Sequence, residues 1–147
     1  MTIVVWDGET LAADRLSTSA FVGMQHQKLH EFTLDGVKHF AAYAGVVGQA
    51  HALFDWVATG KPEATKPTVE DAVLIVVNSA TKEATLYEDT TFGAPAYGFM
   101  AFGASTHVGA AHALKRMGLS ARQIVEKLVA WEEFSAAGVG VDSISFI

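Results

Sequence analysis

The chain opens with Met1-Thr-Ile-Val-Val-Trp-Asp-Gly-Glu-Thr-Leu-Ala-Ala-Asp14, the stretch that decides the fold. Two apolar runs, at 3–6 and 10–13, flank the dipeptide Asp7-Gly8. Asp-Gly between β-type runs favours a type I′ hairpin turn, in which both central residues adopt positive φ. The stretch therefore predicts a hairpin with a two-residue turn. Its expected cross-strand pairs are Trp6 with Glu9, Val4 with Leu11, and Thr2 with Ala13.

Thr2 is the residue of this hairpin best suited to take part in a chemical reaction. In the predicted register Asp14 lies diagonally beside it, within reach of side-chain contact across the ladder. Threonine is small enough for a preceding initiator methionine to be removed, which would leave Thr2 with a free α-amine. Because an α-amine has a reference pKa of about 7.7–8.0, it can act as a general base toward its own residue's hydroxyl. Thr2 is thus a candidate nucleophile, and the alternative is an ordinary strand threonine.

The composition excludes several classes of protein and of functional site. The 147 residues predict one domain over 1–147, and half of them are hydrophobic, enough for a substantial core. A formal net charge of −6 argues against general nucleic-acid binding, which needs clustered basic residues. The chain has no cysteine, which excludes disulfides, thiolate nucleophiles and zinc–thiolate sites and fits a reducing compartment.

No segment of the sequence has the pattern of a membrane anchor. The N-terminus lacks the basic and apolar regions of a signal peptide. The most apolar segment, 40–58, is interrupted by two glycines and carries Gln49, His51 and Asp55, unlike a spanning helix. We therefore expect a soluble, cytoplasmic protein that does not enter a membrane.

Periodicity and turn residues predict blocks of strands separated by helices. Strands are expected at 21–24, 27–34, 37–44, 72–77, 83–88, 98–102 and 141–147. Helices are expected at 49–57, 105–117 and 120–133. Asp35-Gly36 should form a second hairpin turn, Ser120 and Gln123 a capping box, and residues 15–20 and 90–97 irregular structure. This order indicates helices layered on largely antiparallel sheets, which is an α+β fold.

Several short motifs, in their order and spacing, resemble the proteasome β-subunit family, especially the bacterial HslV peptidase and its short bacterial and phage-encoded relatives. The motifs are Thr-Ile-Val at 2–4, Ala-Ala-Asp-Arg at 12–15, Lys28, Ala44-Gly45, Phe102-Gly103, Glu132-Glu-Phe-Ser135 and Val141-Asp142. The resemblance implies an N-terminal nucleophile (Ntn) hydrolase, with a four-layer αββα sandwich of two mainly antiparallel sheets. One helix precedes the strand at 72–77 where the family has two, so this chain would have one helix fewer than usual.

The resemblance also implies an active site. Thr2 would be the nucleophile after removal of Met1, Lys28 the buried ammonium beside it, and Asp14 the carboxylate that orients Lys28. The Gly45 amide would donate to the oxyanion, and Glu132 and Ser135 would support the site. Such a Lys28 would lower the cost of negative charge on the threonine oxygen and favour the neutral α-amine. The oxyanion donor would contribute to transition-state stabilisation.

The function implied is that of a threonine peptidase in a homo-oligomeric ring, acting on peptide or protein substrates, with an ATPase unfoldase as a potential partner. The chain departs from the family at Ala104, where a Gly-Ser-Gly motif has serine, and at Ala136-Ala137, where the family has Gly-Gly. Ala104 and a first hairpin shorter than that of the family favour an alternative, a catalytically silent member of the fold with a structural or assembly role. A third candidate function is hydrolysis of small-molecule amides.

A metal site is the remaining alternative for this region. His26 and His30 flank Lys28 on one strand face. No third ligand is apparent in the sequence and an ammonium stands between the two imidazoles, so we expect neither a metal nor another cofactor.

Overall fold

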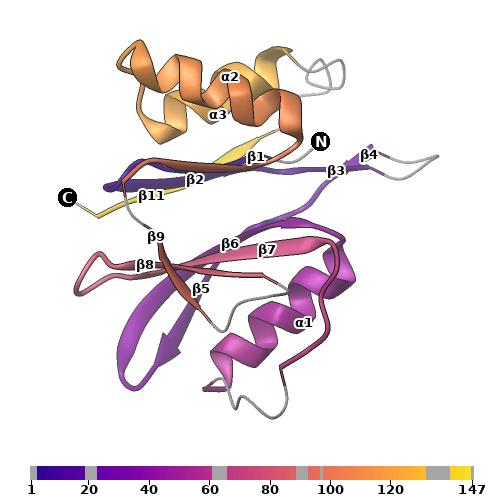
Figure 1. Cartoon of the computed structure of the whole chain (residues 1–147), viewed down its shortest axis with the longest axis vertical. Coiled ribbons are helices and arrows are strands. Elements are labelled where there is room, and N and C mark those ends of the chain that lie inside the picture. The colour runs from indigo at the N-terminus through magenta and orange to yellow at the C-terminus, as the bar shows by residue number, and fades with distance from the viewer. Residues whose placement is uncertain are drawn as a thin grey trace. The chain divides into compact units, whose positions relative to one another are not determined.

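The computed structural model describes residues 3–18, 23–60, 66–88, 93–96, 98–131 and 140–146, which contain two larger sheets, a short hairpin and three helices (Figure 1). Contacts between residues divide the chain into two compact units. Unit 1 comprises residues 1–29 and 98–147, and unit 2 comprises residues 30–97. Unit 1 is therefore assembled from two separate segments of the chain, and unit 2 from the continuous segment between them.

Unit 1 contains a four-stranded antiparallel sheet with the strand order β10-β1-β2-β11. The strands are β1 (Ile3–Trp6), β2 (Thr10–Asp14), β10 (Met100–Gly103) and β11 (Val141–Ser145). Two helices, α2 (Ser105–Arg116) and α3 (Ala121–Trp131), lie together on one face of this sheet (Figure 1). Ile3, Val5 and Ala12 on that face are fully buried in one cluster with the inner sides of the helices. This cluster is the core of unit 1.

Helix α3 begins at the predicted capping box. The N–H of Gln123 donates to Ser120 Oγ at 3.3 Å, and the N–H of Ser120 donates to Gln123 Oε1 at 2.9 Å. A second acceptor comes from the first hairpin, because the Ala121 N–H donates to Asp7 Oδ2 at 2.8 Å. A carboxylate at the positive end of a helix is electrostatically favourable. Asp7 therefore connects the hairpin loop to the start of α3.

Unit 2 contains a five-stranded sheet with the strand order β5-β6-β7-β8-β9. Its strands are β5 (Leu29–Leu34), β6 (Val37–Gly45), β7 (Ala72–Asn78), β8 (Ala84–Tyr87) and β9 (Ala94–Ala96). Helix α1 (Val47–Ala58) lies along one face of the sheet (Figure 1). Leu53, Trp56 and Val57 of the helix pack with Tyr43 and Leu74 of the sheet to form a second core.

The two Asp-Gly dipeptides form different turns. Asp35 and Gly36 both have positive φ, 51° and 76°, as the predicted type I′ turn requires. At Asp7-Gly8 only the glycine has positive φ, because the Asp7 carboxylate instead accepts the N–H groups of Glu9 and Thr10. The predicted register of the first hairpin is therefore wrong by two residues. The observed pairs are Trp6 with Leu11, Val5 with Ala12, and Val4 with Ala13.

Two regions that were expected to be irregular contain short strands. β3 (Leu16–Thr18) pairs with β4 (Gly23–Gln25) as a separate two-stranded hairpin, and β9 pairs with the edge of β8. Strands of three residues are too short to show a period of two in the sequence. Whether such a segment forms a strand therefore depends on the strand with which it pairs. Among the described residues, no helix is long and apolar enough to cross a membrane.

Candidate active site

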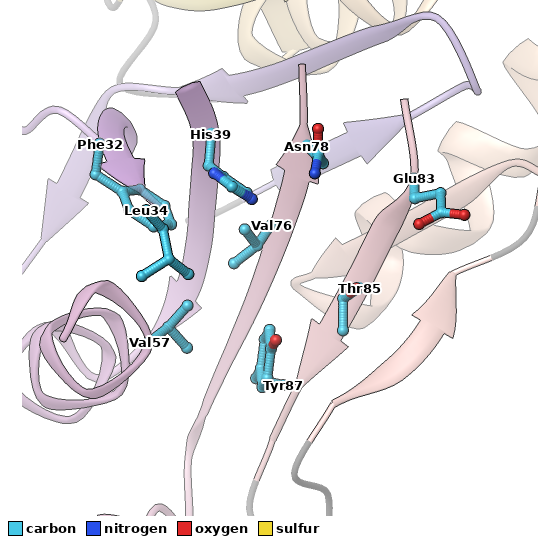
Figure 2. Close-up of a pocket in the computed structure, with 9 residues that line it drawn as sticks. All are labelled: Phe32, Leu34, His39, Val57, Val76, Asn78, Glu83, Thr85 and Tyr87. Atoms are coloured by element: carbon cyan, nitrogen blue, oxygen red, sulfur yellow. The ribbon is translucent and has the colours of Figure 1, made fainter. Parts of the chain in front are cut away.

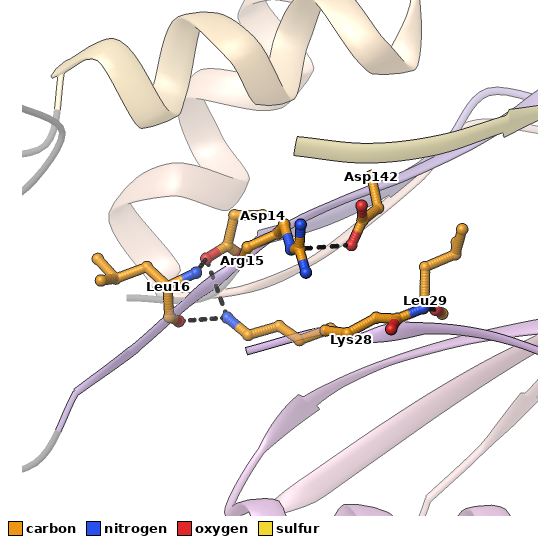
Figure 3. A network of polar contacts seen from close by, with 7 residues as sticks. Asp14, Arg15, Leu16, Lys28, Leu29 and Asp142 are labelled. Atoms are coloured by element: carbon orange, nitrogen blue, oxygen red, sulfur yellow. Dashed lines mark hydrogen bonds and ion pairs between the residues drawn. The ribbon is translucent and has the colours of Figure 1, made fainter. Parts of the chain in front are cut away.

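The carboxylate of Asp14 is the centre of a buried polar network at the end of β2 (Figure 3). Its side chain is fully buried. Asp14 Oδ1 accepts the N–H of Ile3 at 2.8 Å, and Oδ2 accepts the N–H of Leu16 at 2.9 Å. Oδ2 also accepts a hydrogen bond from Lys28 Nζ at 2.9 Å. Two backbone amides and an ammonium therefore stabilise the ionised carboxylate, which makes its burial possible.

Lys28 extends toward Asp14 from the segment between β4 and β5 (Figure 3). Its side chain is 3% exposed, and its Nζ donates to the carbonyl oxygen of Leu16 as well as to Asp14. Burial lowers the pKa of the Lys28 ammonium below its usual 10.5, while the charge of Asp14 and its hydrogen bond oppose that effect. The predicted pairing of Lys28 with Asp14 is confirmed, and Lys28 is buried as the resemblance implies.

A second ion pair lies next to this network. Arg15 Nε is 3.4 Å from Asp142 Oδ2 on β11, and the Arg15 N–H donates to the carbonyl of Gly140 at 3.1 Å. The Arg15 and Asp142 side chains are 38% and 26% exposed, so this pair is more hydrated than Lys28–Asp14. Arg15 lies between Asp14 and Leu16, two partners of Lys28. Through Asp142 and Gly140 it therefore links this segment to the residues that directly follow 132–139, where Glu132 and Ser135 occur in the sequence.

Gly45 ends β6 in a conformation that excludes other residues. Its φ is 107°, and a Cβ at this position would lie 2.1 Å from the carbonyl oxygen of Asp71. The neighbouring Val46 N–H donates to that same oxygen at 2.7 Å. The glycine is thus required by backbone packing within unit 2, and this requirement alone accounts for its presence. Its predicted role as an oxyanion donor stays a prediction.

The predicted site residues are only partly brought together. Asp14 and Lys28 are in direct contact, Gly45 belongs to unit 2, and Thr2, Glu132 and Ser135 lie outside the described residues. Sequence reasoning missed the Leu16 carbonyl as a partner of Lys28, because every residue has a carbonyl and no side chain identifies this one. It also missed the Arg15–Asp142 pair, although both residues stand within motifs that carry the family resemblance.

His30 belongs to an aromatic cluster of unit 2. Its ring stacks on that of Tyr43, with 5.7 Å between the centroids and 10° between the planes. The Tyr43 hydroxyl lies 2.9 Å from Nε2 of His51, and burial raises the pKa of Tyr43 to about 12. No group of three or more His, Cys, Asp or Glu side chains that could hold a metal occurs in the described part of the chain.

Solved structures that resemble this chain share its fold over its whole length. Neither a protein-family model nor a curated protein sequence matches it. HslV from Trypanosoma brucei superposes with a TM-score of 0.62 at 18% identity, covering 99% of each chain. Thiobacillus denitrificans BPH in complex with epoxomicin gives a TM-score of 0.62 at 15% identity and covers both chains completely. Anbu from Pseudomonas aeruginosa, solved as a helical assembly, gives 0.61 at 13% identity, over 99% of this chain and 80% of that one.

Identity this low establishes the fold and nothing finer. The chain has the α+β fold of the proteasome-like Ntn hydrolases, as the sequence motifs predict. Its two larger sheets are antiparallel and carry three helices among the described residues.

Proposed function

We propose that this chain is a threonine peptidase of the Ntn type, with Thr2 as its nucleophile once Met1 has been removed. The observation that carries the proposal is the position of Asp14. Its carboxylate binds the Ile3 amide with one oxygen and the Lys28 ammonium with the other. Since Ile3 directly follows Thr2, the buried charge pair is attached to the backbone one residue from the proposed nucleophile. A plain strand threonine would need no such pair, whose burial is costly.

The proposed reaction uses the two groups of a terminal threonine. The neutral α-amine of Thr2 takes the hydroxyl proton while the oxygen attacks the substrate carbonyl. By the family resemblance, the Gly45 N–H would be the hydrogen-bond donor to the oxyanion that forms. The C–N bond then breaks as the α-ammonium returns the proton to the leaving amine, which leaves an ester on Thr2. Water hydrolyses this ester by the same proton transfers and regenerates the hydroxyl.

Lys28 would supply positive charge to this reaction. Asp14 and the Leu16 carbonyl hold its Nζ from two sides, so the charge is fixed before substrate arrives. A fixed ammonium near Thr2 lowers the energy of an oxygen that is losing its proton, and it favours the neutral form of the α-amine. Glu132 and Ser135 are proposed to support the site.

The proposal extends to the assembly and location of the protein. We infer a homo-oligomeric ring that confines the sites, with a peptide or protein substrate delivered by an ATPase unfoldase in the cytoplasm. The helical assembly formed by the Anbu protein supports association of such chains. A mean hydropathy of +0.26 also favours association, because a chain this apolar is expected to expose contact surface. Native mass spectrometry showing only a monomer at micromolar concentration would exclude the ring.

Ala104 favours a second candidate function, that of a catalytically silent assembly protein. Ala104 is the N-cap residue of α2 and makes no side-chain capping hydrogen bond. The resemblance implies a serine here that supports the threonine amine, and alanine has no hydroxyl to do so. A slow peptidase and a silent scaffold are both compatible with this loss, so activity has to be measured.

The test is the covalent capture of Thr2 by an epoxyketone. Epoxomicin, which the Thiobacillus protein binds, has two electrophilic carbons that a hydroxyl and an adjacent amine can attack together. We expect protein that has lost Met1 to gain the mass of the inhibitor on its N-terminal peptide, and Thr2→Ala protein to gain none. Thr2→Ser is the matched control, because it keeps both reactive groups. Met1-free protein that neither reacts nor cleaves peptide reporters would instead establish the silent assembly role.

A further inference from the structure

The sheet of unit 2 carries a hollow of about 120 Å³ on the face covered by α1 (Figure 2). Its origin is a row of short side chains across three strands, Ala41, Val76 and Thr85. One flanking row consists of the larger Tyr43, Leu74 and Tyr87. The other flanking row, named here the polar row, consists of His39, Asn78 and Glu83. The hollow is therefore a gap between a polar and an aromatic row, and Val76 forms its floor.

The members of the polar row present a defined pattern of hydrogen-bonding groups. Asn78 Oδ1 already accepts the N–H groups of Ala80 and Thr81, so its Nδ2 is left as a donor. His39 Nδ1 must donate to the Val37 carbonyl 2.9 Å away, so Nε2 of the neutral ring is an acceptor. The carboxylate of Glu83 is an acceptor with negative charge. Within the described part of the chain, none of these three groups has a hydrogen-bond partner.

The row thus offers an acceptor, a donor and an acceptor, in the order Glu83, Asn78, His39. Because neighbouring strands lie about 4.8 Å apart, these groups are spaced along roughly 10 Å. An amino acid amide presents the complementary order on one side: an α-ammonium, a carbonyl oxygen and the amide N–H that is cis to that oxygen. A hydrogen bond of about 2.9 Å at each end extends its reach toward the length of the row. A small apolar side chain on that residue would occupy the hollow above Val76. An engineered cavity of about 150 Å³ holds benzene, so the hollow here suits a group of valine size.

Charge also favours a cationic ligand. The segment 30–97 carries nine acidic and four basic residues, so unit 2 accounts for most of the net negative charge of the chain. Glu83 is exposed at the rim of the hollow, so its carboxylate can bind an ammonium while it keeps part of its hydration. Phe32 and Leu34 of β5 and Val57 of α1 complete the apolar wall (Figure 2).

We propose that this hollow binds a free α-ammonium group with its adjacent carbonyl and amide, on a residue with a small apolar side chain. The ligand is an amino acid amide or the N-terminal residue of a peptide. Glu83 binds the ammonium, Asn78 donates to the carbonyl oxygen, and His39 accepts the amide N–H that is cis to that oxygen. A peptide N-terminus has its amide hydrogen trans to the oxygen and would use Glu83 and Asn78 only. The site lies within unit 2 and stands independently of the proposed peptidase activity.

The test is a titration of the ¹⁵N-labelled full chain with valinamide, monitored by the backbone amide shifts of Val76, Asn78 and Glu83. Isovaleramide, which lacks the ammonium, should bind about tenfold to a hundredfold more weakly, the cost of one charged hydrogen bond. Asn78→Asp keeps the acceptor for the Ala80–Thr81 turn and removes the donor, so binding should weaken by at least about tenfold. Thr85→Leu should fill the hollow and abolish binding in a folded protein. Glu70→Gln, an exposed carboxylate outside the row, is the matched control and should bind normally.

A second arm distinguishes the two sources of this chemistry. Tighter binding of Val-Gly-Gly than of valinamide would assign the site to peptide N-termini, and equal binding would assign it to single residues. N-acetyl-Val-Gly-Gly should not bind in either case. The proposal is overturned if valinamide causes no shifts, if isovaleramide binds equally well, or if Thr85→Leu leaves binding intact while the protein remains folded.

Discussion

The Lys28–Asp14 pair of unit 1 and the polar row of unit 2 use similar residue types in opposite ways. Both contain a carboxylate, and both lie where strands end. Asp14 is fully buried and its oxygens are bound by two backbone amides and an ammonium of the same chain. Glu83 is exposed beside a hollow, with its carboxylate left to solvent or ligand. The buried carboxylate therefore stabilises the fold through contacts within the chain, and the exposed carboxylate remains available to bind a ligand.

The largest effect expected from this contrast is that of Asp14→Ala. The change leaves Lys28 buried without a counter-charge and removes an acceptor from two amides, so we expect a loss of about 3–5 kcal/mol in the free energy of unfolding. Urea denaturation at neutral pH measures it. The double variant Asp14→Leu/Lys28→Met is the control, and it should recover part of the loss because no unpaired charge remains. A loss below about 1 kcal/mol would show that the pair is hydrated in solution.

The buried ammonium should also make stability depend on alkaline pH. The Lys28 pKa is lowered in the folded protein, so between that value and 10.5 the unfolded chain binds more protons than the folded one. The free energy of unfolding contributed by this group must then rise with pH across that window. We expect wild type to gain stability relative to Lys28→Met as the pH approaches 10.5. A difference that stays constant or shrinks would contradict a lowered pKa of Lys28 in the folded protein.

The Arg15–Asp142 pair tests an intermediate degree of burial. Its side chains are about a third exposed, so solvent screens the interaction and a double-mutant cycle should give a coupling of about 0.2–1 kcal/mol. Arg15→Gln, Asp142→Asn and the double variant complete the cycle, with stability measured by urea denaturation. A coupling of several kcal/mol would place this pair in the same class as Lys28–Asp14.

The smallest effect is expected for Glu83→Gln. This carboxylate is exposed and makes no contact that folding requires, so the free energy of unfolding should change by no more than about 0.5 kcal/mol. Thermal denaturation followed by circular dichroism is sufficient to measure it. A loss comparable to that of Asp14→Ala would mean that Glu83 has a structural role, and the contrast between the two regions would disappear.

The sequence predicted the elements more successfully than the details of their pairing. Asp35-Gly36 formed the expected turn, and in the described part of the chain the Asp35 carboxylate accepts no hydrogen bond that would favour another turn. Asp7-Gly8 did not, since its carboxylate binds the loop amides and the start of α3, a residue 114 positions away. A local dipeptide pattern contains no information about such a distant partner.

The candidate site was predictable to the extent that its residues carry distinctive side chains. Lys28 and Asp14 were paired on the strength of the family resemblance, and the structure places them 2.9 Å apart. The wrong hairpin register did not spoil this, because a shift of two residues keeps every side chain on its face. The Leu16 carbonyl meets Lys28 only because the fold brings residues 16 and 28 together, and the polar row forms only when β6, β7 and β8 pair. Neither contact can be predicted from a single segment of the sequence.

The division of unit 1 into two segments affects how the protein can be synthesised. β1 and β2 emerge from the ribosome before unit 2, but β10 and β11, which flank them, follow only after all of unit 2 has been made. The nascent β1–β2 hairpin therefore carries two unpaired edges for much of translation, a state prone to aggregation. Unit 2 is contiguous and can fold meanwhile. Because Glu132 and Ser135 are also translated after unit 2, a nascent chain could not assemble the proposed peptidase site prematurely beside the ribosome.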